Sequence, residues 1–192
     1  MPKRFFASIV VLATVFMAST ATAQSGPREG FYAGLGAGWG SYNLSASGYS
    51  LSSTYKSNWT YMVEAGFSPS KKFRIGFEGD YYTKSSSGAK LENWFYMGEG
   101  TYYPSLGNNF YLKGGLGWAD TKGSGGGGSA SQGGFAINLG LGVDILPAKN
   151  AFALNIYTNY LTQLAGGAYT GSSVKYESHL WQIIGVAIAY KH

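Results

Sequence analysis

The sequence predicts an all-β fold, an eight-stranded antiparallel up-and-down transmembrane β-barrel. Apolar and polar residues alternate with period two through eight segments, and aromatic residues recur on most of these segments at a spacing of eight. The 192-residue chain is 17% aromatic but only 12% charged, and it contains 30 glycines. Charged residues make up about a quarter of an ordinary soluble domain. The composition therefore suits strands whose outer surface does not face water.

The N-terminus is typical of a secretory signal peptide. Lys3 and Arg4 form a basic start, residues 5–18 are mostly apolar, and Ala21 and Ala23 are the small residues of a cleavage site. The apolar stretch is short for a membrane-spanning helix, which needs about 20 apolar residues. We therefore predict a signal peptide over 1–23 and a single barrel domain over 24–192.

The eight expected strands are 31–42, 58–68, 72–83, 92–103, 110–121, 134–146, 151–161 and 178–191. After the signal peptide the sequence contains no run of 18 apolar residues. A mature chain that spans a membrane must therefore do so as a closed barrel, because every backbone polar group in lipid has to be paired.

The connections between these strands alternate in length. Three are short, at 68–71, 104–109 and 147–150, and four are long, at 43–57, 84–91, 122–133 and 162–177. Short periplasmic turns and longer extracellular loops are typical of outer-membrane barrels. We therefore expect four exposed loops, with the glycine run at 123–129 as a flexible tip, and both chain ends on the periplasmic side.

Paired aromatic residues mark both ends of most strands. Eight residues of tilted strand rise about 20 Å along the barrel axis, close to the apolar band of about 25 Å between the aromatic girdles of such barrels. Strand 134–146 departs from the pattern, with Phe135 and Ile145 at its ends, and the last strand has Gln182 opposite Tyr190. The predicted girdle consists of Phe31, Trp39, Trp59, Phe67, Phe73, Tyr81, Trp94, Tyr102, Phe110, Trp118, Phe152, Tyr160 and Tyr190.

The two faces of the strands differ in charge. Between the girdle positions, the face that carries the aromatic residues has 41 positions and no charge, whereas the opposite face has 33 positions and seven charges. Glu92 and Asp120 continue the apolar face just beyond the girdle, where water is expected to begin. The predicted interior charge network is Glu64, Arg74, Glu78, Asp80, Glu99, Lys113 and Asp144.

The apolar face is predicted to point outward into lipid. A soluble barrel would instead bury that face as its core, and this alternative stays open. The interior of eight strands is just wide enough for side chains, so glycines and paired charges fit it better than stacked Trp and Phe. In the last strand, alternation places Trp181 and Ile183 inward and Gln182 outward, which indicates a β-bulge there.

The residues that could carry chemistry are few. The chain has no cysteine, and we expect no metal site and no cofactor. Ser178, His179 and Glu177 could form a nucleophilic set, but alternation places His179 inward, and adjacency in sequence does not give triad geometry. His179 is therefore interpreted as a polar rim residue, and the protein is predicted not to be an enzyme.

Three segments resemble a known family. The opening FYAGLGAGWGSY, the strand FYLKGGLGWAD and the final IIGVAIAY are similar to the eight-stranded outer-membrane barrels, which include the OmpA membrane domain, OmpX and the opacity proteins. The resemblance covers about 31–192. It implies a location in the bacterial outer membrane and assembly by the barrel-assembly machinery. Family members typically end in an aromatic residue, whereas this chain places Tyr190 near its end and finishes in His192.

The predicted function is that of a non-enzymatic outer-membrane protein with an envelope-structural or surface-interaction role and a polar, plugged interior. A small-solute channel is the first alternative, and a lipid A-modifying enzyme is the second. The expected partners are outer-membrane lipid, lipopolysaccharide and a surface ligand at the loops. Lys56 and Lys175 are candidates to meet lipopolysaccharide phosphates. With no basic cluster in the sequence we expect no nucleic-acid partner, and we expect a monomer.

Overall fold

The computed structural model describes residues 29–46, 49–50, 57–105, 109–126, 128–145, 152–166 and 176–191. The strands in these residues are β1 (Gly30–Ala46), β2 (Tyr49–Ser50), β3 (Asn58–Ser70), β4 (Phe73–Ser86), β5 (Ala89–Tyr102), β6 (Phe110–Gly125), β7 (Gly128–Ile145), β8 (Phe152–Gly166) and β9 (Tyr176–Lys191). No helix in the described residues is long and apolar enough to cross a membrane. The predicted signal peptide and the turn at 147–150 lie outside these residues.

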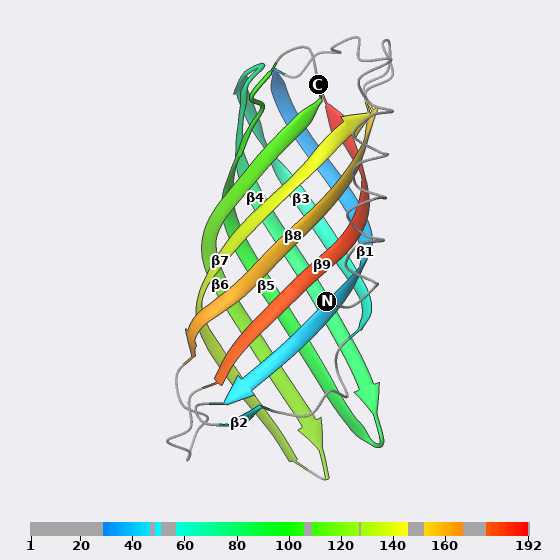
Figure 1. Cartoon of the computed structure of the whole chain (residues 1–192), viewed down its shortest axis with the longest axis vertical. Helices are drawn as coiled ribbons and strands as arrows, with labels where there is room; N and C mark the ends of the chain where they lie inside the picture. Colours follow the sequence, from blue (N-terminus) through cyan, green and yellow to red (C-terminus); the bar gives the residue numbers. More distant parts are fainter. Residues whose placement is uncertain are drawn as a thin grey trace, which may run out of the picture.

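Eight strands form one closed antiparallel wall. The order runs from β1 through β3 to β9, and β9 returns to pair with β1. Within the described ranges, the two-residue β2 pairs with the end of β1 alone. Figure 1 shows the strands inclined around a vertical axis with the chain following neighbour after neighbour. The predicted eight-stranded up-and-down barrel is confirmed.

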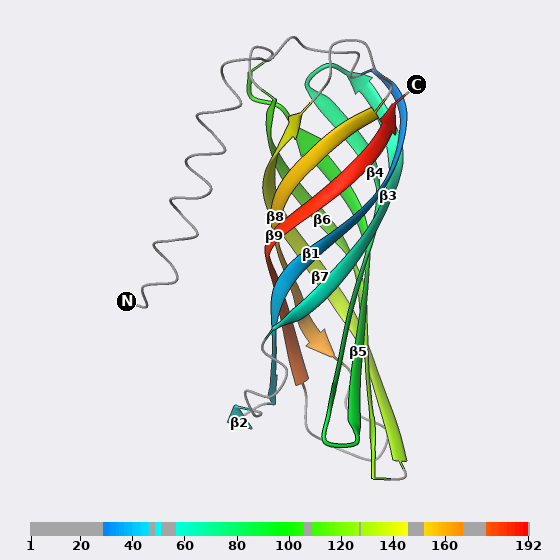
Figure 2. The same cartoon turned by 90° about the vertical axis from the view of Figure 1, so that its right-hand side faces the viewer.

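Two of the four connections expected to be long loops are extended hairpins instead. In 84–91, the strands β4 and β5 pair as far as Ser86 and Ala89, and the turn residues Ser87 and Gly88 both have positive φ, as a tight two-residue hairpin turn requires. In 122–133, β6 and β7 pair as far as Gly125 and Gly128. Figure 2 shows both hairpins reaching beyond the rest of the wall.

The expectation of loops at these two places was wrong for a physical reason. Past the apolar band both faces of a strand meet water, so the alternation of apolar and polar residues fades although the backbone ladder continues. Hydrogen bonds between backbones do not depend on side-chain type. The glycine-rich segment at 123–129 therefore forms part of a paired hairpin, although its composition is that of a flexible linker.

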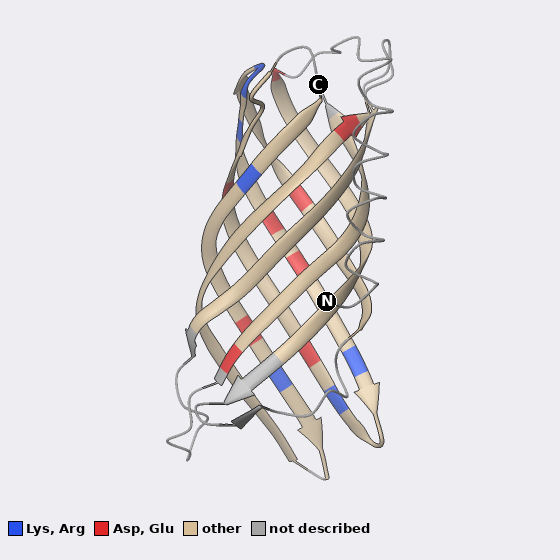
Figure 3. Cartoon of the chain, viewed as in Figure 1, with Lys and Arg blue, Asp and Glu red and all other residues tan. Residues whose placement is uncertain are grey.

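The side chains alternate across the wall as predicted. Most outward residues between the two ends of the barrel are apolar and exposed on the isolated chain, such as Leu35 at 69% and Ile188 at 58%. Their neighbours in sequence point inward and are buried. Charged residues are sparse along the wall, and most of it is uncharged (Figure 3).

A β-bulge in β9 confirms the irregularity expected there but reverses the expected orientations around it. Ile183 has no partner on β1 or β8, because Gln182 and Ile184 take consecutive positions opposite Gly40 and Trp39. The extra residue shifts the alternation by one. Trp181 is therefore outward and 41% exposed, and Gln182 is inward and fully buried, the opposite of the predicted placement.

The barrel interior contains more large side chains than expected. Among the residues that the structure describes, seven aromatic side chains point inward and are buried: Tyr32, Tyr42, Tyr82, Phe95, Tyr103, Tyr111 and Tyr157. Glycines paired with them on the neighbouring strand make room for some of these side chains. A Cβ at Gly185 would lie 2.2 Å from the Tyr157 ring, and one at Gly142 would lie 2.5 Å from the Tyr111 hydroxyl. The inward glycines therefore accept bulky neighbours rather than leaving the interior filled by small residues.

Gly117 offers a test of this close packing. A Cβ there would lie 1.9 Å from the backbone oxygen of Tyr96, a clash that no side-chain rotation relieves. We expect Gly117→Ala to lower the free energy of unfolding by about 1–3 kcal/mol, as overpacking does. Urea unfolding in detergent micelles measures it. Gly98→Ala is the matched control, because its Cβ would meet only one atom, at 3.7 Å. Equal stability of the two variants would contradict the packing.

Candidate functional site

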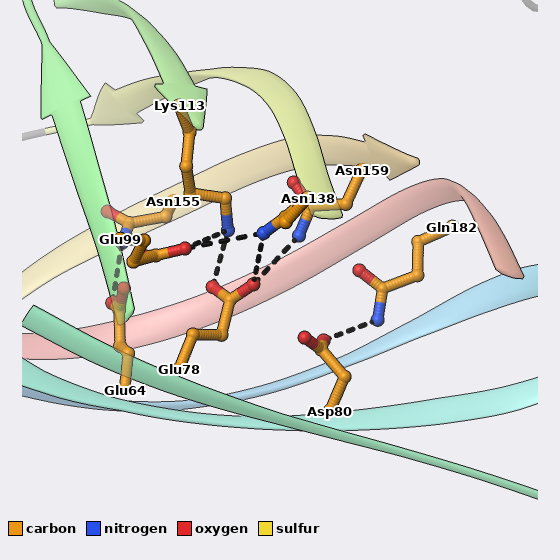
Figure 4. Close-up of polar contacts among 9 residues, drawn as sticks. All are labelled: Glu64, Glu78, Asp80, Glu99, Lys113, Asn138, Asn155, Asn159 and Gln182. Atoms are coloured by element: carbon orange, nitrogen blue, oxygen red, sulfur yellow. Dashed lines mark hydrogen bonds and ion pairs between the residues drawn. The ribbon is translucent and has the colours of Figure 1, made fainter. Parts of the chain in front are cut away.

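The seven predicted interior charges all lie on the inner face of the wall, and they form two groups. Lys113 on β6 pairs with Glu78 on β4, and it lies 3.6 Å from Glu99 on β5. These groups are almost fully buried, so each charge depends on its partners for the interactions that water would otherwise supply. Figure 4 shows the Lys113 ammonium aimed between the two carboxylates.

Amide side chains complete this middle layer of the interior. The Asn138 amide donates to Glu78 at 3.1 Å and to Glu99 at 3.3 Å, and Asn159 donates to Glu78 at 3.2 Å. Glu64, which is half-buried, accepts from Asn155 at 3.3 Å. The carboxylates of Glu64, Glu78 and Glu99 each place an oxygen within 4.8 Å of the others, so the amides and Lys113 offset a concentration of negative charge.

Asp80 has its partner on β9, 102 residues away in sequence. The Gln182 amide donates to the Asp80 carboxylate at 2.7 Å, and both side chains are fully buried. Gln182 reaches the interior only because the bulge at Ile183 turns it inward. The bulge therefore supplies a hydrogen-bond donor to a buried carboxylate.

A second charged group lies toward the end of the barrel that carries the β3–β4 turn. Arg74 donates to Asp144 at 2.7 Å, and the Tyr103 hydroxyl donates to the same carboxylate oxygen at 2.8 Å. The Arg74 guanidinium lies 5.3 Å from the ring centre of Tyr32 and 4.9 Å from that of Tyr103. A buried ion pair and the two rings beside its guanidinium fill this end of the interior.

The opposite end of the interior, on the side of the β4–β5 and β6–β7 hairpins (the hairpin end), combines an apolar cluster with buried polar side chains such as Asn93, Thr121 and Gln163. Its buried cluster consists of Tyr42, Tyr82, Leu91, Phe95, Met97, Ala119, Ala136, Leu161 and Leu180. The rings of Tyr42 and Tyr82 stack with centres 5.0 Å apart. Asn93 donates to the Tyr42 hydroxyl at 3.2 Å and also to Thr121. Packed rings and hydrogen-bonded polar side chains thus fill the hairpin end of the interior.

The sequence predicted the charged residues of this interior but not the amide side chains that donate hydrogen bonds to the carboxylates. Asn138, Asn155, Asn159 and Gln182 come from three strands late in the chain and meet carboxylates from strands early in the chain. Asparagine is depleted in strands, so its recurrence at inward positions was the available signal. Their carboxylate partners could not be read from the sequence, because the register between distant strands decides them.

The thirteen predicted girdle residues lie on the outer face in two rings. Eleven are exposed, and Tyr81 and Phe110 are half-buried. Aromatic side chains on neighbouring strands touch, as those of Trp39 and Trp59 do with ring centres 5.8 Å apart. Trp181 takes the place on β9 where Gln182 was predicted. The girdle nearer the β4–β5 and β6–β7 hairpins contains the tryptophans and is called the tryptophan-bearing ring. The other girdle is made mostly of Phe and Tyr.

The suspected nucleophilic set does not assemble. Ser178 is inward and fully buried, and its hydroxyl donates to Gln163 at 2.9 Å. His179 points outward, contrary to the prediction. The bulge at Ile183 moves the residues that precede it in β9 to the opposite face. Its Nδ1 lies 2.7 Å from the Thr162 hydroxyl and 3.1 Å from the Tyr160 hydroxyl. The wall of the barrel therefore separates Ser178 from His179.

Glu92 lies on the outer face just beyond the tryptophan-bearing ring, as predicted, and Asp120 is exposed at the same level. The Lys90 ammonium at 2.8 Å and the Tyr81 hydroxyl at 2.9 Å hold the pKa of the Glu92 carboxyl below its usual range. A charged carboxylate at this level fits a boundary where water begins. Lys56 and Lys175, the candidate phosphate contacts, lie outside the described residues.

Comparisons with known proteins agree with this architecture. Neisserial surface protein A (NspA) is 17% identical over 84% of this chain and 97% of its own, with a TM-score of 0.55. Ail, the attachment invasion locus protein of Yersinia pestis, solved with the heparin analogue sucrose octasulfate, is 16% identical over 84% of this chain and 99% of its own, with a TM-score of 0.52.

The sequence itself matches a family model. No curated protein sequence matches the chain significantly. The model described as the outer membrane protein beta-barrel domain matches residues 8–183, which is most of the chain. Together with the closed wall of eight strands, this confirms the resemblance drawn from the sequence. The chain belongs to the family of small β-barrel proteins of the bacterial outer membrane.

Proposed function

We propose that this protein is a closed, non-enzymatic barrel that contributes to envelope structure and carries surface-exposed hairpins for interaction. The observation that supports this function best is the filling of the interior. Buried rings occupy the hairpin end, the Lys113 network occupies the middle, and the Arg74–Asp144 pair occupies the other end. Eight strands leave little free space beside such side chains.

The two girdles of aromatic residues around the barrel are proposed to lie at the two membrane–water interfaces. Amphipathic rings prefer this level of a bilayer, and the residues between the rings are apolar and outward. The short β3–β4 turn then lies in the periplasm, and the β4–β5 and β6–β7 hairpins project from the cell. Outer-membrane lipid, including lipopolysaccharide, is thus proposed as the immediate partner, and the barrel as a monomer.

The surface-interaction part of this function rests on the hairpins. Lys90 and Lys122 are exposed beyond the tryptophan-bearing ring, and the exposed Ser131 lies across from Lys122. Exposed hairpins on a rigid wall are well placed to carry binding residues. Attachment, the activity in the name of one similar barrel, guides the assay: cells that display the protein should bind host cells or matrix, and removal of the 84–91 hairpin tip should reduce binding.

Conductance tests the closed interior. In planar bilayers we expect the wild-type barrel to show no stable open channel, because side chains block its axis at three levels. Phe95→Ala combined with Tyr82→Ala, which empties the hairpin end, should raise the frequency of brief openings. The charged middle layer favours a small-ion conduit as the second candidate function. Stable channels in the wild-type protein would support that candidate and overturn the closed barrel.

A further inference from the structure

The strands β7, β8 and β9 run side by side (Figure 1). The outer wall carries a groove over them. The groove has a volume of about 530 Å³, and its outward lining residues are Leu139, Leu141, Thr158, Tyr160 and Trp181. Thr158 is short, whereas Leu139, Tyr160 and Trp181 project from the wall around it with 61%, 43% and 41% of their surfaces exposed. A short side chain among long ones creates the depression.

The bulge in β9 fixes the shape of this groove. It turns Trp181 outward, where the indole donates to the Thr158 hydroxyl at 3.3 Å, and the same hydroxyl donates to the backbone oxygen of Gln182 at 2.7 Å. The indole is therefore pinned at one side of the groove. A groove with a fixed wall loses less entropy when it is filled than one that must form on binding.

Polar side chains lie at the hairpin side of the groove. The imidazole of His179 stacks on the Tyr160 ring with centres 6.1 Å apart, and its Nδ1 is bonded by Thr162 and Tyr160. Its Nε2 lies 4.0 Å from the Glu177 carboxylate, and both side chains are partly open to solvent. This arrangement combines an aromatic plane with hydrogen-bond donors and acceptors, next to an apolar groove.

We propose that the groove holds one acyl chain of an outer-leaflet glycolipid, whose sugar hydroxyls bond to His179 and Glu177. The groove opens on the lipid-facing wall in the half of the barrel that carries the hairpins, so a membrane lipid is the molecule in contact with it. The Glu177 carboxylate repels a phosphate at this position and accepts hydrogen bonds from hydroxyls. The chemistry at this position therefore selects contact with sugar hydroxyls over contact with a phosphate. This proposal rests on the proposed position of the barrel in the outer membrane, with the hairpins outside the cell, and it does not depend on whether the barrel conducts.

Native mass spectrometry tests the proposal on the folded chain purified from outer membranes in mild detergent. The probes are rough-type lipopolysaccharide and phosphatidylglycerol, each added back to delipidated protein. We expect the wild type to retain one lipopolysaccharide molecule. Thr158→Leu, which fills the groove, should reduce the retained fraction roughly tenfold, equivalent to about 1.4 kcal/mol. Ala37→Leu, on the lipid face of β1 away from the groove, is the matched control and should retain it.

A second variant distinguishes the contribution of the lipid headgroup from that of the acyl chain. His179→Phe keeps the ring on Tyr160 but removes both nitrogens, so it should weaken retention of lipopolysaccharide and leave retention of phosphatidylglycerol unchanged. Heat-modifiable migration in gels verifies that each variant is folded. The proposal is overturned if the wild type retains no lipopolysaccharide, if it retains phosphatidylglycerol equally well, or if Thr158→Leu behaves like Ala37→Leu.

Discussion

Replacement of Lys113 by methionine is expected to lower the free energy of unfolding by about 3–5 kcal/mol, as the removal of one partner from a buried ion pair does. Lys113 faces two carboxylates, and inside the barrel Glu64, Glu78, Asp80, Glu99 and Asp144 outnumber the two cations Arg74 and Lys113. Methionine has a similar length and leaves no large cavity. The loss should therefore arise from uncompensated negative charge, and urea unfolding in detergent micelles measures it.

Two comparisons isolate the electrostatic cause. Lys122→Met removes an exposed lysine from the same strand and should change stability by less than about 0.5 kcal/mol. Adding Glu78→Gln to Lys113→Met removes one unpaired charge and should restore part of the loss. The deficit of Lys113→Met should also shrink as the pH falls, because protonation neutralises the carboxylates. A deficit independent of pH, with no rescue by Glu78→Gln, would assign the effect to packing.

Leu35→Arg is expected to destabilise the barrel in lipid by about 2–4 kcal/mol, the cost of an arginine at the bilayer midplane. Leu35 lies midway between Phe31 and Trp39 on β1, points outward and is 69% exposed on the isolated chain. A soluble protein would tolerate a charge at so exposed a position. Unfolding by urea from liposomes measures the cost.

The matched control is Asn43→Arg, on the same face of β1 but beyond the tryptophan-bearing ring. Asn43 is exposed, and at that level the cost of an arginine falls to about 0–1 kcal/mol. The difference between the two variants reports depth in the membrane rather than the general effect of adding a charge. If both variants lost the same stability, Leu35 would not lie in the apolar band.

The fold could be predicted from the sequence because the alternation of residues within each strand is enough to define the wall of a small barrel. Alternation with period two assigns each residue to a face, and a residue such as Leu35 or Lys113 needs no knowledge of distant strands to be placed. The eight strands, the outward apolar face and the inward charges followed from this rule alone. The spacing of the aromatic residues then indicated where each strand leaves the apolar band.

The failures occurred where long-range contacts decide the structure. The direction of Gln182 depends on the bulge at Ile183, and its partner Asp80 is on another strand far away in the chain. The orientation of His179 was wrong for the same reason. The interior aromatic residues were underestimated because Gly185 faces Tyr157 only in the folded register. The pairing of the 122–133 segment was missed because a hairpin in water needs no apolar pattern.

The most direct test of the inside-out barrel is an accessibility scan along β6. The chain has no cysteine, so single cysteines at positions 111–116 can each carry a nitroxide label without competing sites. In lipid bilayers we expect oxygen, which dissolves in the membrane, to relax labels at Leu112, Gly114 and Leu116 more strongly than labels at Tyr111, Lys113 and Gly115. The opposite pattern, or no alternation along the strand, would contradict an apolar face in lipid and a charged interior.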